Sequence, residues 1–262
     1  MRLVWLTDLH LPFVDYYERF FEALAALPAD ALVITGDIGD ADRTPAYLQT
    51  LAEHFEKPIY FVYGNHDFYH GSVEKARAEA RLLCGSTPNL HYLSDGAVIE
   101  LTPQTALIGH DGWADGRFGN WATSYLELND YYLIKELAVR TKAERLTGIQ
   151  ALAAESADAI TAGLTQAMAR YAHVIVATHV PPFREVCWHQ GKIGDDDGLP
   201  HFSSKVFGEA ILKVAAAHPE SRVTVLCGHT HSPAKAQIAP NVYAIAGEAE
   251  YGKTAVQEIF EY

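Results

Sequence analysis

The stretch Ile59–Asp67 has the sequence IYFVYGNHD, in which an apolar run directly precedes a polar cluster. The run Ile59–Tyr63 is typical of a strand that is buried on both faces, and the Gly-Asn pair after it is a turn signal. On either side lie two segments with apolar residues at helical spacing, Pro45–Phe55 and Val73–Leu83. This order of helix, strand and helix predicts βαβ units and a mostly parallel sheet.

The same alternation extends along the chain in both directions. Toward the N-terminus, two buried strands are expected at Arg2–Thr7 and Ala31–Thr35, with a helix over Asp15–Leu27 between them. Toward the C-terminus, the periodicity predicts a long helix that is interrupted near Gly148 and Gly163. The expected elements there are helices over Lys142–Tyr171 and Ser204–Ala217, and strands over His173–Thr178, Arg222–Cys227, Ala234–Ile238, Val242–Ala246 and Thr254–Phe260.

The segment from residue 90 to residue 109 has a different pattern. Short strands are expected at Leu90–Leu93, Ala97–Leu101 and Thr105–Gly109, and the links between them resemble hairpin turns. We therefore expect antiparallel pairing here. An α/β fold with two packed mixed sheets and helices outside them, a four-layer αββα sandwich, accommodates all of these elements.

Two further segments are too long for ordinary connections. Asp111–Asp130 is rich in glycine, tryptophan, tyrosine and aspartate, and Pro181–Ser204 is a long polar stretch. We expect both to form cap-like insertions in a single domain that spans residues 1–262.

Composition narrows the classes of function. Apolar residues make up 49% of the chain, charged residues 20%, and the formal net charge is −13, which argues against binding to long nucleic acid. Cys84, Cys187 and Cys227 form no CxxC pair, so we expect reduced thiols and a cytoplasmic protein. No apolar run reaches about 18 residues, and no secretion signal precedes the first strand, so no membrane span is expected. The oligomeric state is not determined by the sequence.

Polar clusters follow several of the expected strands. In chain order they are Asp8-Leu9-His10, Gly36-Asp37, Gly64-Asn65-His66-Asp67, His179-Val180-Pro181 and Gly228-His229-Thr230-His231. In open α/β sheets, ligands bind beyond the carboxyl ends of the strands. We therefore expect these clusters to converge on one edge of the sheets.

The side chains in these clusters suit a pair of metal ions. Carboxylate oxygen, imidazole nitrogen and amide oxygen together favour divalent Mn, Fe, Zn, Co or Ni. Asp8 and His10 share a face on an ideal strand, as do His229 and His231, so each pair can bind one ion. A lone carboxylate such as Asp37 can bridge two ions, and ions about 3.5–4 Å apart can ionise a water between them.

Each cluster has a simpler explanation when it is taken alone. Asp-x-His is usually a capping aspartate beside a surface histidine, Gly-Asp is more often a turn, and Gly-His-Thr-His could be a surface histidine pair. Gly-Asn-His-Asp is more specific, although turn chemistry explains part of it. The combination, in one order and after apolar strands, is not explained by turns and predicts a dinuclear hydrolytic site.

Together the clusters resemble the calcineurin-like metallophosphoesterases, whose pattern is D-x-H, GD, GNHD, H and GHxH. Every part of the pattern is present between Asp8 and His231. The resemblance implies a β-sandwich flanked by helices and two divalent ions, with Mn or Fe favoured. It assigns the first ion to Asp8, His10, Asp37 and His231, and the second to Asp37, Asn65, His179 and His229.

The same resemblance implies a reaction. A hydroxide that bridges the metals attacks phosphorus in line, His66 protonates the leaving group, and Asp67 orients His66. Hydrolysis of a small phosphodiester is favoured, and a phosphomonoesterase or a nucleotide pyrophosphatase is the alternative. A non-catalytic scaffold with this fold is a further alternative, although all ligand positions and His66 are intact.

The cap-like segments carry the expected substrate contacts. Trp113 and Trp188 offer flat apolar faces for the organic part of the substrate, while Arg117 and Arg184 offer guanidinium groups for phosphate oxygens. For residues 111–130 the alternative is a small aromatic core of the cap, which would include Trp113 and Trp121.

Overall fold

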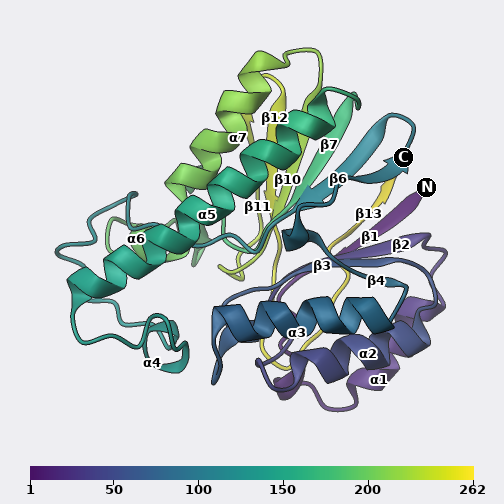
Figure 1. The fold of residues 1–262 in the computed structure, drawn as a ribbon, viewed down its shortest axis with the longest axis horizontal. Coiled ribbons are helices and arrows are strands. Elements are labelled where there is room, and N and C mark those ends of the chain that lie inside the picture. Colours follow the sequence, from purple (N-terminus) through teal and green to yellow (C-terminus); the bar gives the residue numbers. More distant parts are fainter.

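Two β-sheets lie face to face at the centre of the structure, a computed structural model that describes residues 1–262 (Figure 1). The first sheet contains β1 (Arg2–Leu6), β2 (Ala31–Thr35), β3 (Ile59–Val62), β4 (Leu90–Tyr92) and β13 (Glu258–Glu261). Its strand order is β13-β1-β2-β3-β4, and only β13 is antiparallel to its neighbour. The first and last strands of the chain therefore lie side by side.

The second sheet is also mixed. It contains β5 (Ile99–Thr102), β6 (Thr105–Gly109), β7 (His173–Ala177), β10 (Arg222–Cys227), β11 (Ala234–Ala239) and β12 (Val242–Ala246). Its order is β11-β12-β10-β7-β6-β5, with a parallel centre and an antiparallel strand at each edge. The expected mixed sheets are therefore present.

The antiparallel pairing expected for residues 90–109 is only partly right. β5 and β6 form an antiparallel hairpin, but β4 pairs in parallel with β3 in the other sheet. A 3-10 turn at Leu93–Asp95 and a left-handed Gly96, with φ of 82°, carry the chain from one sheet to the other. Leu93 is buried between the sheets, so its packing selects a crossover where the turn residues suggested a hairpin.

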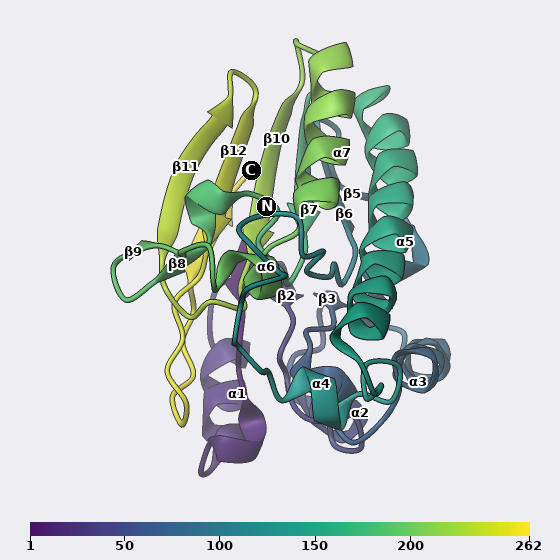
Figure 2. The ribbon, with the colours of Figure 1, turned by 90° about the vertical axis from the view of Figure 1, so that its left-hand side faces the viewer.

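Helices cover the outer face of each sheet (Figures 1 and 2). Those on the first sheet are α1 (Tyr17–Ala25), α2 (Thr44–His54) and α3 (Val73–Ser86), and those on the second are α5 (Lys142–Met168) and α7 (Lys205–Ala217). This arrangement confirms the predicted four-layer αββα sandwich. None of the helices is long and apolar enough to cross a membrane.

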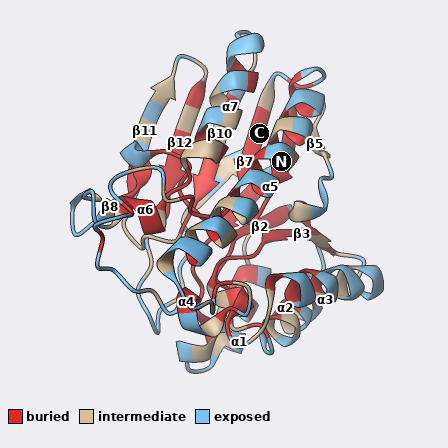
Figure 3. Ribbon diagram, turned by 60° about the vertical axis from the view of Figure 1, so that its left-hand side comes forward, coloured by how far each residue is buried: buried red, intermediate tan, exposed pale blue.

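Alternation along the strands divides the core into layers. In β1, Leu3 and Trp5 pack in the layer between the sheets, whereas Val4 and Leu6 pack against the helices. Trp5 also donates a hydrogen bond from Nε1 to Thr35 Oγ1 in β2, at 2.9 Å. Because both faces of such strands are covered, nearly all of their residues are buried (Figure 3), which explains the continuous apolar runs.

The helix α5 has no break, so the interruptions expected near Gly148 and Gly163 are wrong. The helix begins with a capping box, in which Thr141 and Glu144 each accept a hydrogen bond from the other's backbone amide. Its 27 residues include a buried stripe that packs on the second sheet and on α7. That packing outweighs the cost of about 1 kcal/mol that each glycine adds in a helix.

The two expected insertions lie together on one side of the molecule (Figure 2). Residues 111–129 form loops and turns, followed by α4 (Asp130–Leu133). Residues 181–204 contain a 3-10 turn at Arg184–Val186, the hairpin of β8 (Trp188–His189) with β9 (Lys192–Ile193), and α6 (Leu199–Phe202). Ser124 Oγ lies 2.9 Å from the Asp197 carbonyl oxygen and 2.8 Å from His201 Nε2, so the two segments support each other.

A buried ion pair joins α3 to the start of residues 111–130. Asp111 is 1% exposed and accepts hydrogen bonds from Arg77 Nε at 2.9 Å and from the hydroxyls of Tyr92 and Ser94. Burial raises the pKa of Asp111, but Arg77, His110 and the hydroxyls of Tyr92 and Ser94 together outweigh burial, and the net shift is downward. Arg77 makes the largest single contribution to stabilising the ionised carboxylate.

Replacing Arg77 by leucine should lower the free energy of unfolding by about 3–5 kcal/mol, because it leaves a buried charge unpaired. The matched control is Arg81→Leu on the same helix, where Arg81 and Asp95 form a pair with side chains 51% and 40% exposed. That exposed pair should contribute about 0–1 kcal/mol. Urea unfolding measures both losses, and equal losses would show that the Asp111 network is not needed for stability.

Candidate metal centre

The carboxyl ends of strands from both sheets meet at one edge of the structure. They bring together the seven predicted metal ligands, which are Asp8, His10, Asp37, Asn65, His179, His229 and His231. Ligand atoms of Asp8, His10, Asp37 and His231 lie within 4.8 Å of one another. The other group is continuous with them, since His179 lies 3.4 Å from Asp37. The polar clusters therefore converge as expected.

Asp37 lies at the centre of this cluster and is 2% exposed. Its Oδ2 atom is 3.7 Å from His10 Nε2, and its Oδ1 atom is 3.4 Å from His179 Nε2. Burial raises the pKa of Asp37, but His179, His66 and His10 together outweigh burial and hold the pKa well below its usual value. The two oxygens of an ionised carboxylate thus face two different groups of ligands, as a bridging ligand requires.

The first group of ligands surrounds Asp8. The Nε2 atoms of His10 and His231 are 2.9 Å apart, and His231 Nε2 is 3.4 Å from Asp8 Oδ1. Burial lowers the pKa of His10 to about 4, so its imidazole is neutral near pH 7. Imidazole nitrogens that converge on carboxylates form a set of ligand atoms that fits a divalent cation.

The second group contains His179, Asn65 and His229. His179 Nδ1 lies 2.8 Å from the Thr35 carbonyl oxygen, and its Nε2 lies 3.1 Å from Asn65 Oδ1. Burial lowers the pKa of His179, but Asp37, Asp8 and the Thr35 carbonyl together outweigh burial and raise it to about 10, so this position attracts positive charge. His229 Nε2 is buried without a hydrogen-bond partner, and burial lowers the pKa of His229 to about 3. A neutral imidazole nitrogen without a hydrogen-bond partner, next to a site that attracts positive charge, can bind a second cation.

Five of the seven residues have a left-handed backbone. The φ angle is 49° at Asp8, 43° at His10, 52° at Asp37, 73° at His229 and 54° at His231. The shared strand face expected for Asp8 with His10, and for His229 with His231, is therefore wrong, because both pairs lie in turns beyond the strand ends. Such conformations cost about 1–3 kcal/mol each and are concentrated at functional sites.

Two motif glycines make room for the carboxylates. A Cβ atom at Gly64 would lie 2.2 Å from Asp37 Oδ1, and one at Gly228 would lie 2.1 Å from Asp8 Oδ2. Any side chain at these positions would displace a predicted ligand. Close approach to Asp37 and Asp8 therefore explains the glycines of Gly-Asn-His-Asp and Gly-His-Thr-His.

His66 lies beside the cluster. Its Nε2 atom is 4.0 Å from Asp37 Oδ2, and its ring stacks on Tyr69 with 4.3 Å between the ring centroids. The side chain is 15% exposed and lines the cleft above the cluster. The ring is therefore accessible to a molecule bound in the cleft.

The structure gives Asp67 a different role from the expected orientation of His66. Its buried carboxylate accepts hydrogen bonds from three backbone amides and one hydroxyl, those of Ile38, Gly39, Gly64 and Thr44. None of these partners is the His66 ring. Asp67 instead joins the loops that follow β2 and β3, because its side chain points away from the cleft into those amides.

A cleft of about 840 Å³ opens above the cluster. Asp37, His66 and His231 line it on the side of the cluster. The remaining lining comes from residues 126–130, from the β8–β9 hairpin and its flanking loops, and from the segment after β12. Both expected insertions therefore contribute to the cleft.

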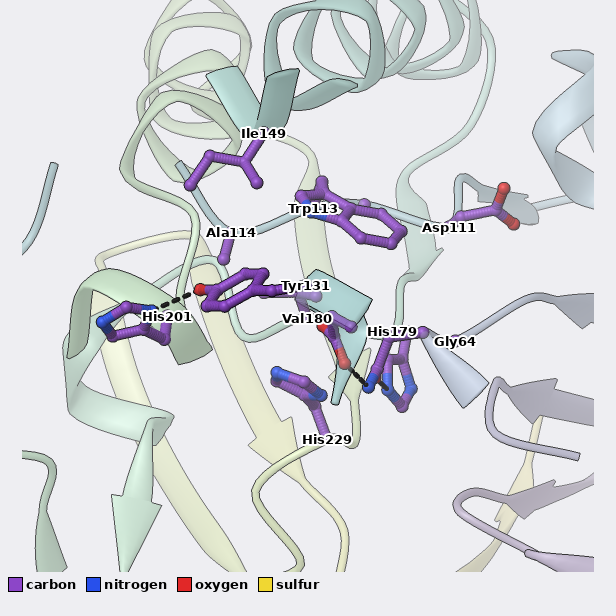
Figure 4. A pocket seen from close by; sticks show the side chains of 13 residues that line it. Gly64, Asp111, Trp113, Ala114, Tyr131, Ile149, His179, Val180, His201 and His229 are labelled. Carbon is purple, nitrogen blue, oxygen red and sulfur yellow. Dashed lines mark hydrogen bonds between the residues drawn. The ribbon is translucent and has the colours of Figure 1, made fainter. Parts of the chain in front are cut away.

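Trp113 does not face this cleft, contrary to the expected substrate contact. It is 5% exposed, packs on Phe68, and lines a separate narrow cavity of about 10 Å³. Figure 4 shows that cavity, with Trp113 and Ile149 on one side and His179 and His229 on the other. The indole is therefore part of the core, which agrees with the alternative of an aromatic cap core.

The other three expected substrate contacts have different positions. Arg117 and Arg184 are exposed, but neither lines the cleft. Trp188 does line the cleft, and its Nε1 donates a hydrogen bond to the Glu185 carbonyl at 2.8 Å. Only Trp188 of the four is placed to meet a bound molecule.

Sequence reasoning missed two residues at the site. The ring of Tyr251 lies 4.5 Å from that of His10 and 5.2 Å from that of His231, and its side chain lines the cleft. Asp130 accepts a hydrogen bond from Asn65 Nδ2 at 2.9 Å. Tyr251 lies outside every sequence motif of the site. Asp130 is the last residue of the first expected insertion, and no motif in the sequence marks it as a functional residue.

Two solved structures resemble this one at low sequence identity. A phosphopantetheinyl hydrolase from Mycobacterium tuberculosis gives a TM-score of 0.71 at 15% identity, over 95% of this chain and 89% of that chain. A dimetal phosphatase from Danio rerio gives a TM-score of 0.58 at 14% identity, over 95% of this chain and 87% of that chain. These similarities establish the fold. A search of curated proteins by sequence found no match.

A sequence model of one family covers most of the chain. It is described as calcineurin-like phosphoesterase and matches residues 1–233. The matched part contains every polar cluster of the candidate centre, while Tyr251 lies beyond it. Both the extent of this match and the αββα fold lead to one conclusion, that the chain belongs to the calcineurin-like phosphoesterase family.

Proposed function

We propose that this protein is a two-metal hydrolase that acts on small phosphodiesters. The charge of the cleft is the observation that supports a diester. The lining carries five carboxylates, but Lys192 is its only lysine or arginine. Near pH 7 a phosphodiester carries one negative charge, whereas a phosphomonoester carries about 1.5–2. A nucleotide with a pyrophosphate group carries still more.

The charge of the substrate matters because of the carboxylates at the cleft. Charges on the rim of a cleft act on a bound anion over several ångströms, and solvent weakens that interaction where the side chains are exposed. Of the carboxylates away from the metal ligands, Glu127 is paired with Arg145 at 3.1 Å, whereas Asp195 and Asp197 form no ion pair. Both are exposed, so solvent weakens their repulsion of an additional negative charge on the substrate, but no ion pair cancels it.

The size of the cleft also fits a substrate with two organic groups. Its volume of about 840 Å³ is ample for a small diester. Trp188 and Tyr251 line it from separate segments, and each offers a flat ring. We assign these two rings to the organic groups of the substrate, in place of Trp113, Arg117 and Arg184.

The residues of the site divide the chemistry between them. One ion would be held by Asp8, His10, Asp37 and His231, and the other by Asp37, Asn65, His179 and His229. When bound, the ions supply the Lewis acidity that activates water and neutralises phosphate oxygens. His66 faces the cleft without being a ligand, so it would donate a proton to the leaving oxygen.

The alternatives use the same ligands and differ in substrate charge. For a phosphomonoester or a nucleotide pyrophosphate, the bound ions would have to offset more negative charge, because the lining adds only Lys192 as a further cation. A non-catalytic scaffold does not require His66 to face an open cleft. A phosphopantetheinyl ester belongs in any substrate panel, because one of the similar structures is a phosphopantetheinyl hydrolase.

With Mn²⁺ bound, the protein should hydrolyse bis(4-nitrophenyl) phosphate with a kcat/KM at least about tenfold above that for 4-nitrophenyl phosphate. The physical reason is the weaker repulsion of a monoanion by the cleft. Release of nitrophenol measures both rates. A preference for the monoester would contradict the diester assignment. If the protein hydrolyses neither of the two nitrophenyl esters nor a phosphopantetheinyl ester, the non-catalytic scaffold is favoured.

The control for this experiment compares two tryptophans. Trp188→Ala should lower the ratio of diester to monoester activity by about 3–30-fold, because a wall for the second organic group is lost. Trp113→Ala should lower stability but leave the ratio unchanged, since Trp113 is buried outside the cleft. If Trp113→Ala changes the ratio and Trp188→Ala does not, Trp113 is the substrate contact.

Replacing His66 by alanine should preserve metal binding and reduce turnover by about 10²–10⁴-fold. The loss should be larger for methyl phenyl phosphate than for methyl 4-nitrophenyl phosphate, because phenolate is the poorer leaving group and needs the proton more. His70→Ala, an exposed histidine of the same segment outside the cleft, is the control. Equal losses for the two esters, or loss of metal, would rule out a general-acid role.

A further inference from the structure

Asp130 is a buried carboxylate that contacts two residues of the turn after β3. It is 6% exposed and stands at the start of α4, more than sixty positions along the chain from that turn. Its Oδ1 atom accepts hydrogen bonds from Asn65 Nδ2 at 2.9 Å and from the Tyr69 hydroxyl at 2.7 Å. One oxygen thus holds a predicted metal ligand and its neighbour.

These contacts determine which way the Asn65 amide points. The Nδ2 group donates to Asp130 and also lies 3.2 Å from the Tyr69 hydroxyl, which accepts the second hydrogen bond. The amide oxygen then faces His179 Nε2 at 3.1 Å, inside the candidate metal centre. A rotated amide would place its oxygen against the Asp130 carboxylate, and two acceptors would repel each other.

Tyr69 is held by the same carboxylate. It is 6% exposed, and its hydroxyl donates its one hydrogen bond to Asp130. Its ring stacks on His66, with 4.3 Å between centroids and 29° between planes. Asp130, Tyr69 and Asn65 therefore form one hydrogen-bonded unit that extends under the accessible histidine.

We propose that Asp130 is a positioning residue, which acts with Tyr69 to hold the Asn65 amide oxygen toward the second metal ion. This inference rests on the proposed two-metal function. Partners that orient a metal ligand typically change metal affinity by about 10–100-fold when they are removed. Because residues 126–129 line the cleft just before Asp130, the same residue also ties one wall of the cleft to the metal centre.

If Asp130 had a purely structural role, its replacement would reduce stability without weakening the binding of one ion more than the other. Asp115 provides the comparison, since it is a fully buried carboxylate in the same segment. It accepts hydrogen bonds only from the backbone amides of Arg117 and Val206, at 2.9 and 2.8 Å. Replacing Asp115 should therefore reduce stability without a selective effect on either ion.

The test is a calorimetric titration with Mn²⁺ alone, without substrate. Asn65→Ala first identifies which binding step belongs to the second ion. Asp130→Ala, which removes the acceptor, should then weaken that step by about 10–100-fold and leave the other step within about threefold of wild type. Asp115→Ala should leave both steps within about threefold. Tyr69→Phe keeps the ring but removes the hydroxyl, and it should weaken the same step in the same direction.

Wild-type affinity for both ions in Asp130→Ala, or an equal weakening of both steps, would overturn the positioning role. If Asp130→Ala fails to fold, Tyr69→Phe decides, and wild-type affinity in that variant overturns the proposal. Failure of the proposed function has a different signature, because the wild-type protein would then bind fewer than two ions.

Discussion

The carboxylate of Asp37 is the constraint on which the rest of the site depends. It is almost fully buried, ionised, and placed between His10 and His179, so one oxygen faces each half of the cluster. A charge in this position is costly unless positive charge compensates for it. The neighbouring histidines can supply that charge as protons, and metal ions would supply it more completely. The cluster is therefore organised around the need to neutralise one carboxylate.

The surrounding fold supplies the rigidity that this arrangement requires. Left-handed residues such as Asp8 and His229 are strained, and Gly64 and Gly228 leave no space for adjustment. Two sheets with covered faces hold the strand ends, and the backbone amides that donate to the Asp67 carboxylate connect the loops after β2 and β3. The strain at the edge is thus balanced by packing elsewhere.

The sequence predicted the layers and the convergence of the polar clusters, because apolar runs and motif residues are local signals. It did not predict features that depend on packing between distant segments. Leu93 turns a hairpin-like sequence into a crossover because it is buried between the sheets. Trp113 packs on Phe68 in the core between the first sheet and the helices, while Tyr251 reaches the site from beyond the last motif. Asp67 was given the wrong partner, since a motif shows which residues occur together but not which way each side chain points.

Crystals grown with Mn²⁺ and measured at the manganese absorption edge test the central claim most directly. The account predicts two anomalous peaks about 3.5–4 Å apart, with Asp37 Oδ1 bound to one ion and Oδ2 bound to the other. It also predicts that His66 contacts neither ion. A single peak, or two peaks with Asp37 bound to neither, would contradict the assignment of Asp37 as the bridge and with it the two-metal mechanism.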